Sequence, residues 1–164
     1  MDFPSETQQQ FRAVSSALTG FADIDLIAAG MGETYWNELV SIAGITIAGE
    51  FLSACGEVFA RSRDERSLEQ NLRTHIMDDP KFGPLARNVI VLWYMGQWNA
   101  LPPSWADAYG GSVDDVTHVL SPQAYREGLV WPAFGSHPRA AKATGFGSWA
   151  EPPLIPINTD YYHS

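Results

Sequence analysis

Histidines are the residues of this sequence that could most readily support catalysis or metal binding. The four histidines, His75, His118, His137 and His163, form neither a His-x-x-x-His nor a Glu-x-x-His pair. A metal site would therefore depend on ligands that only the fold brings together. His75 flanks an apolar helical stripe and is expected at the edge of the core. His137 precedes Pro138 and is expected to make a structural hydrogen bond in a loop.

Paired carboxylates and a thiol are the next candidates. Asp78-Asp79 and Asp114-Asp115 are adjacent in sequence, and neighbours of this kind seldom converge on one substrate, so we interpret them as solvated turn or cap residues. Cys55 is the one cysteine, which excludes an intramolecular disulfide and a multi-cysteine metal site. Its place on an apolar helix face predicts a small core residue with a raised pKa.

Glycine-rich motifs can bind phosphate groups or present a nucleophile. The run Gly145-Phe146-Gly147-Ser148 lacks the Lys-Ser/Thr ending of a phosphate-binding loop, and the sequence contains no Gly-x-Ser-x-Gly hydrolase motif. We therefore predict no catalytic, cofactor-binding or metal-binding residue in this chain, and we do not expect it to be an enzyme.

Two helices are predicted before residue 44. Ser5 to Gln8 fit a capping box at the start of the first, and Gly20 is a natural stop at its end. The second begins after Asp23 or Asp25. One apolar stripe along it comprises Ile27, Met31, Tyr35, Leu39 and Ile42.

Three more helices follow before residue 98. The third carries an apolar face from Ile47 to Val58, and the fourth runs from about Glu65 to Met77. Pro84 can open the fifth at its first turn. Its segment Val89 to Met95 is apolar all round, which periodicity alone cannot distinguish from a buried strand. Because no alternating partner strand occurs elsewhere, we predict a central helix.

Composition defines two parts of one domain. The chain has 164 residues. Eight of its 11 prolines lie after Leu101, and five of its six tryptophans lie from Trp93 onward. We predict an all-α fold: a bundle of about five helices over residues 1–98, followed by a long irregular Trp/Gly/Pro-rich segment over residues 99–164. Such a segment must lie on this bundle or on another protein.

Charge restricts the class of partner. Ten Lys and Arg against 19 Asp and Glu give a net charge of −9, which disfavours nucleic acid. The longest uncharged run contains too few apolar residues for a membrane span.

The C-terminal segment is the candidate interface. Aromatic residues alternate there with glycines, which allow close backbone approach, and with prolines, which lower the entropy cost of ordering. The alternative is that these side chains cap the chain's own bundle, and both roles can coexist. The residues predicted to bind a partner are Tyr125, Arg126, Trp131, His137, Phe146 and Trp149.

Several segments carry a family resemblance over roughly residues 11–153. These segments are Leu18-Thr19-Gly20-Phe21, the Leu-Trp-Tyr-x-Gly-x-Trp pattern of residues 92–98, residues 125–131, Gly135 with His137-Pro138, and residues 145–153. In them the sequence resembles the small-subunit family of membrane-bound, FAD-dependent sugar and polyol dehydrogenases of the D-sorbitol dehydrogenase type, with glucose, fructose and gluconate dehydrogenase small subunits as distant relatives.

The resemblance implies an accessory role. Subunits of this kind are non-catalytic partners of a large flavoprotein of the glucose-methanol-choline type, which holds the FAD, and often of a multihaem cytochrome c. They commonly act as an escort, or chaperone, for export and maturation of the large subunit. The resemblance places the chain in a periplasmic, membrane-associated complex. Residues 1–5 carry no export signal, so a native start at Met1 without co-export implies the cytoplasm instead.

A sugar-binding module is the alternative function. Tryptophan rings stack on pyranose faces, and the sequence has six tryptophans. Such modules are usually β-rich, so helical structure favours the accessory subunit over this alternative.

Overall fold

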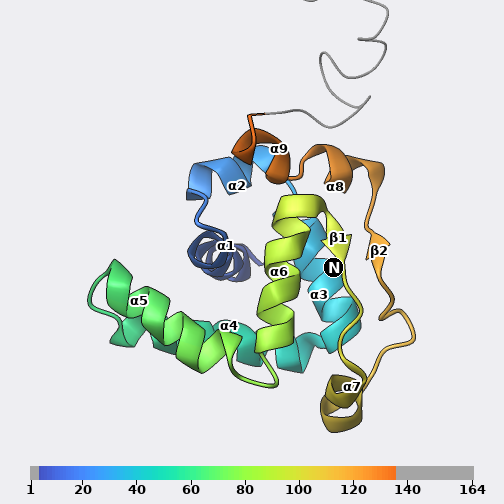
Figure 1. The fold of residues 1–164 in the computed structure, drawn as a ribbon, viewed down its shortest axis with the longest axis horizontal. Helices are drawn as coiled ribbons and strands as arrows, with labels where there is room; N and C mark the ends of the chain where they lie inside the picture. Colours follow the sequence, from blue (N-terminus) through green and yellow to red (C-terminus); the bar gives the residue numbers. More distant parts are fainter. Residues whose placement is uncertain (1–3, 136–164) are drawn as a thin grey trace, which may run out of the picture.

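Helices form most of the structure, as the apolar spacing predicts (Figure 1). The structure is a computed structural model that describes residues 4–135. The all-α prediction is confirmed. The elements before residue 96 are α1 (Ser5–Thr19), α2 (Asp23–Ala29), α3 (Gly32–Ala43), α4 (Ile45–Arg61), α5 (Glu65–Leu72), the π-helical turn η1 (Arg73–Met77) and α6 (Gly83–Met95).

Helix α1 ends where the sequence predicts. Gly20 adopts a left-handed conformation, with φ of 79°, and its N–H donates to the Ser16 carbonyl. The predicted capping box at the start is wrong. Pro4 occupies the N-cap position and Ser5 is already helical, so the Ser5 side chain does not cap the helix.

The second predicted helix is two helices. Gly30, with φ of 67°, ends α2, and α3 starts two residues later. The predicted stripe continues through the break at Met31 and along α3, where Tyr35 and Leu39 are buried, but Ile27 on α2 is 49% exposed. A left-handed glycine changes the helix direction, so residues before and after it no longer share one face.

Helices α4 and α5 lie where the spacing predicts them. Cys55 on α4 is fully buried. A capping box that the sequence prediction missed starts α5: the Asp64 carboxylate accepts from the Ser67 N–H, and the Ser67 hydroxyl accepts from the Asp64 N–H. The predicted fourth helix extends to Met77 because η1 continues α5 with wider π-helical turns.

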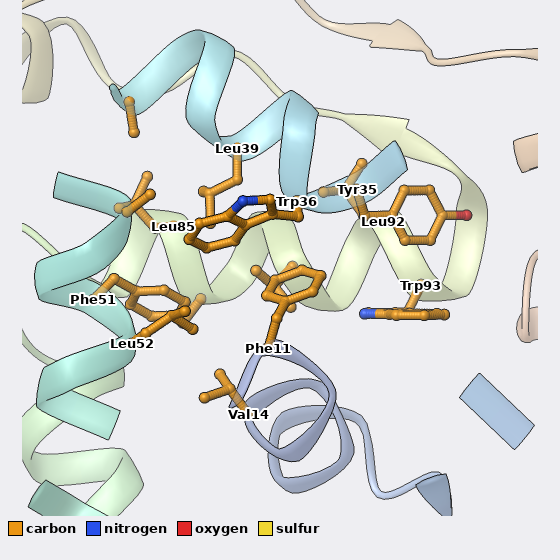
Figure 2. Close-up of a cluster of buried hydrophobic side chains, with 14 of the residues drawn as sticks. Phe11, Val14, Tyr35, Trp36, Leu39, Phe51, Leu52, Leu85, Leu92 and Trp93 are labelled. Atoms are coloured by element: carbon orange, nitrogen blue, oxygen red, sulfur yellow. The ribbon is translucent and has the colours of Figure 1, made fainter. Parts of the chain in front are cut away.

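Helix α6 is the centre of the bundle. It contacts α1, α3, η1 and the short helices α8 and α9 introduced below. Neighbours on several sides explain why its segment Val89 to Met95 is apolar all round. Leu85, Val89 and Leu92 are fully buried along it. Figure 2 shows Leu92 and Trp93 of α6 beside Tyr35 of α3, with Phe11 and Val14 of α1 below them.

Residues 99–135 pack onto the bundle through short elements joined by long connections. The remaining elements are β1 (Gln97–Trp98), α7 (Pro103–Tyr109), β2 (His118–Val119), α8 (Pro122–Arg126) and α9 (Val130–Ala133). Strands β1 and β2 pair antiparallel, with Trp98 opposite His118. The expected irregular segment therefore includes three short helices, and part of it covers the chain's own core through Trp105 and Leu129, which are 3% and 5% exposed.

The connection from α7 to α8, residues 110–120, is here called the arm. The Asp115 carboxylate in it accepts from the Trp98 indole N–H at 2.9 Å and from the Leu101 N–H at 3.0 Å. The interpretation of Asp115 as a solvated turn residue is therefore wrong, because both of its donors lie on the segment after α6. Asp115 ties the arm to the bundle.

Loss of the Asp115 oxygens should destabilise the fold. We expect Asp115→Ala to lower the free energy of unfolding by about 1–3 kcal/mol, because Trp98 is fully buried and its N–H would lose its acceptor. Asp115→Asn keeps an acceptor oxygen and should lose less than half as much. Urea unfolding of the three proteins measures the difference, and equal losses in both variants would contradict the hydrogen-bond explanation.

Candidate functional site

Residues 121–135, here called the cap, form the candidate interface. Local sequence explains how the cap starts: the Ser121 hydroxyl accepts from the Ala124 N–H at 3.0 Å, and Pro122 occupies the first helical position of α8. Helix α9 follows after Gly128 and Leu129. Figure 1 shows α8 and α9 together at the end of the bundle where α6 ends.

Close backbone approach holds the cap on α6. The Leu129 N–H donates to the Trp93 carbonyl at 2.9 Å. A Cβ on Gly128 would lie 2.7 Å from the Tyr94 carbonyl oxygen, and one on Gly96 would lie 2.4 Å from the Ala124 backbone. These contacts are shorter than side chains tolerate, so glycine is required at both places.

The structure brings together two of the three predicted interface residues that it describes. Tyr125 and Trp131 make an edge-to-face ring contact with centroids 5.4 Å apart, and the Trp131 indole N–H donates to the Tyr125 carbonyl at 2.9 Å. Arg126 lies in the last turn of α8, and all three side chains are half-buried. Trp131 therefore both packs within the cap and keeps part of its ring surface exposed. The other predicted interface residues, His137, Phe146 and Trp149, lie outside the described residues.

Exposed apolar side chains that the sequence prediction missed lie at the same end. Phe134 follows α9 directly and is 80% exposed. Met95 ends α6, and Ile24 and Ile27 lie on α2, which Figure 1 places at this end of the bundle. The spacing of Ile27 indicated a core residue, and only the break at Gly30 leaves it on the surface.

Residues that could do chemistry are dispersed in the described part of the chain. Within residues 4–135, no group of three or more His, Cys, Asp or Glu side chains could hold a metal ion. His75, predicted at the edge of the core, is exposed instead. Burial raises the pKa of the Cys55 thiol to about 12, as the sequence predicts, so the thiol stays protonated at neutral pH.

His118 is the histidine with a defined setting. Its Nε2 lies 3.0 Å from Oε1 of Glu38 on α3, and its Nδ1 lies 2.7 Å from the Val116 carbonyl oxygen. A histidine–carboxylate pair can move a proton. In the described residues this pair also joins the arm to α3.

An open groove of about 730 Å³ lies between the end of α1, α5 and α6. Leu18, Leu68, Leu72 and Ile90 contribute apolar surface to it, and charged side chains of α5 line it as well. It brings together no histidine or cysteine, so it offers a binding surface and no evident chemistry.

Within residues 4–135, no single helix has both the length and the apolar composition to cross a bilayer. Helices α3 and α4 meet these two criteria only when taken as a pair, and that pair is bent by 118°.

Comparison with known proteins gives no match: no family model, no curated protein and no solved structure is significantly similar to this chain.

Proposed function

We propose that this chain is a non-catalytic accessory subunit that binds its partner through the cap. The observation that carries the proposal is the surface at this end of the bundle: Phe134 is 80% exposed, Trp131 is partly exposed, and Met95 at the end of α6 is 51% exposed. Aromatic residues and methionine are enriched in interface cores, and large aromatics that reach solvent are typical anchors.

Rigidity of the cap supports this role. Hydrogen bonds and glycine contacts fix α8 and α9 on α6, so Trp131 and Phe134 are presented on a defined backbone. A surface ordered before binding loses less conformational entropy when the partner arrives. Trp131 also has contacts inside the cap, with the ring and the carbonyl of Tyr125, so in this proposal its side chain has both an internal and an interfacial role.

The partner that we propose is the large, FAD-containing dehydrogenase subunit of the glucose-methanol-choline type. This identification rests on the resemblance in residues 92–98 and 125–131, and these two segments contact each other through Leu129 and Trp93. In this proposal the flavin and the oxidation of a sugar or polyol belong to the partner, a multihaem cytochrome c is a possible third subunit, and the complex is periplasmic. This chain stabilises or escorts the flavoprotein.

A stand-alone sugar-binding module is less well supported. Stacking on a pyranose needs accessible tryptophan faces, but four of the five tryptophans in the described residues are 5% exposed or less, namely Trp36, Trp93, Trp98 and Trp105. Trp131 alone of these five offers a partly exposed ring.

Removal of an aromatic side chain from the cap should weaken assembly with the flavoprotein. We expect Trp131→Ala to reduce affinity for the flavoprotein about 30-fold, because a buried interfacial aromatic contributes ~2 kcal/mol or more and ~1.4 kcal/mol is tenfold. Phe134→Ala should act in the same direction. Because Phe134 is 80% exposed, this change should alter the unfolding free energy by no more than ~0.5 kcal/mol. Co-expression with the products of neighbouring reading frames, followed by pull-down and titration, measures the affinity of both variants for the flavoprotein.

Two controls separate binding from folding. Val113→Ala removes an apolar side chain that is 96% exposed but lies in the arm, so assembly should not change. Trp36→Ala removes a core tryptophan that is 5% exposed, so it should destabilise the isolated chain. The proposal fails if Phe134→Ala binds normally while Trp131→Ala destabilises the isolated chain as much as Trp36→Ala does.

A further inference from the structure

The arm is attached to the bundle by a small number of identifiable contacts. Backbone pairing joins β2 to β1, the Leu120 N–H donates to the Gly96 carbonyl at 3.0 Å, and Asp115 accepts from Trp98. All of these contacts are made to the segment that follows α6. The contact with α3 is different, because it joins two ionisable side chains, Glu38 and His118.

The hydrogen-bond geometry determines how many protons this contact needs. The Val116 carbonyl can only accept, so Nδ1 of His118, 2.7 Å away, carries a proton and donates it. The Nε2 atom then lies 3.0 Å from Oε1 of Glu38. That contact is a hydrogen bond only while one further proton lies between the two atoms, either on the imidazole or on the carboxyl group. Without that proton, the nitrogen lone pair faces a carboxylate oxygen.

We propose that Glu38 and His118 form a proton-dependent clasp, which holds the arm against α3 while the pair shares its proton and loosens the arm when the proton is lost. Glu38 and His118 are 80 positions apart in sequence, so the clasp joins α3 to a segment whose other contacts are with the residues that follow α6 and with α8.

The electrostatic surroundings favour retention of the proton by the pair. Burial raises the pKa of Glu38, the nearby His118 lowers it, and Asp114 on the arm raises it further. Asp115 adds a second carboxylate on the arm. Strand β1 contributes no ionisable side chain, and α8, which also contacts β2, carries Tyr125 and Arg126.

The direction of the pH dependence follows from this balance. A carboxyl group whose pKa is raised in the folded state binds its proton more tightly when folded than when unfolded. Its contribution to stability is therefore present at low pH and is lost as pH rises through the folded-state value. Because the two groups share one proton, they titrate as a unit, and the clasp should weaken as the pair deprotonates.

Amide hydrogen exchange tests the clasp in the full chain. Protection of the Leu120 amide reports the arm, and protection of the Gly96 amide, which donates to Leu92, is the reference for the bundle. As the pH rises through the deprotonation of the pair, in which the pKa of Glu38 is raised by burial, we expect Leu120 protection to fall about tenfold relative to Gly96 after correction for intrinsic exchange.

Glu38→Gln is the matched variant. Its amide N–H₂ can donate to Nε2 of His118 without titrating. In this variant, relative protection of Leu120 should stay constant over the same pH range. As a second measurement, the side-chain carboxyl resonance of Glu38 in the wild-type chain should shift over the same pH interval in which Leu120 protection falls.

The outcomes are distinct. A parallel loss of Leu120 protection in the wild type and in Glu38→Gln overturns the proposal, since the arm would then respond to other groups. Constant protection in the wild type while the Glu38 carboxyl resonance completes its shift also overturns it, and this result does not depend on folding of the variant. None of these measurements requires a partner, so they remain independent of the proposed subunit role.

Discussion

Gly96→Ala should destabilise this protein by about 2–5 kcal/mol. Two costs combine at this position. Gly96 has φ of 65°, and an L-residue in this left-handed region costs about 1–2 kcal/mol. A Cβ there would also lie 2.4 Å from the carbonyl carbon and oxygen of Ala124, so α8 would have to move, with an overpacking cost of about 1–3 kcal/mol.

Gly20→Ala separates the two costs. Gly20 also ends a helix with a positive φ, of 79°, but nothing lies within 4 Å of the position that its Cβ would take. Its change should therefore show the conformational cost alone, about 1–2 kcal/mol. Denaturant unfolding of both variants gives the comparison. Equal losses at the two positions would show that α8 does not press on Gly96 in solution.

Leu92→Ala should lower the free energy of unfolding by about 2–5 kcal/mol, as large-to-small changes in a packed core do. Leu92 is fully buried on α6, and Figure 2 shows it near Tyr35 of α3. Its backbone carbonyl also accepts the Gly96 N–H, so the end of α6 depends on the same turn. The cavity left by three missing carbon atoms cannot collapse easily among aromatic neighbours such as Trp93 and Tyr35.

Met95→Ala is the control on the same helix. Met95 is 51% exposed, one turn from Leu92, so its truncation should change stability by no more than ~0.5 kcal/mol. Urea unfolding at an unchanged denaturant slope measures both variants. A loss below about 1 kcal/mol for Leu92→Ala would mean that this position is not packed as the structure has it.

The candidate site was only partly predictable. Aromatic residues between glycines indicated the segment around Trp131, and the structure brings the rings of Tyr125 and Trp131 into contact there. Exposure of Phe134 and of Ile27 could not be predicted. An apolar residue carries the same pattern in sequence whether it faces the core or solvent, and the direction of its helix decides between them.

Local rules were sufficient for most of the helices. The spacing of apolar residues predicted α4, α6 and the extent of α5 with η1, because side chains three and four positions apart share a face. Gly20 predicted the end of α1 for an equally local reason, its freedom to take a positive φ. The same local reasoning was wrong for Ser5, because Pro4 takes the N-cap position, and for Ile27, because a turn at Gly30 interrupts the face.

The sequence by itself determined the helical class of this protein, its central helix and the absence of any recognisable catalytic motif. Only the tertiary structure decided which distant residues meet: Asp115 with Trp98, Glu38 with His118, and Gly96 with Ala124. The physical reason is that a helix buries one face, so apolar side chains recur three and four positions apart and leave a period in the sequence. A pairing of two-residue strands, or of two side chains 80 positions apart, leaves no period and exists only once the helices between them have packed.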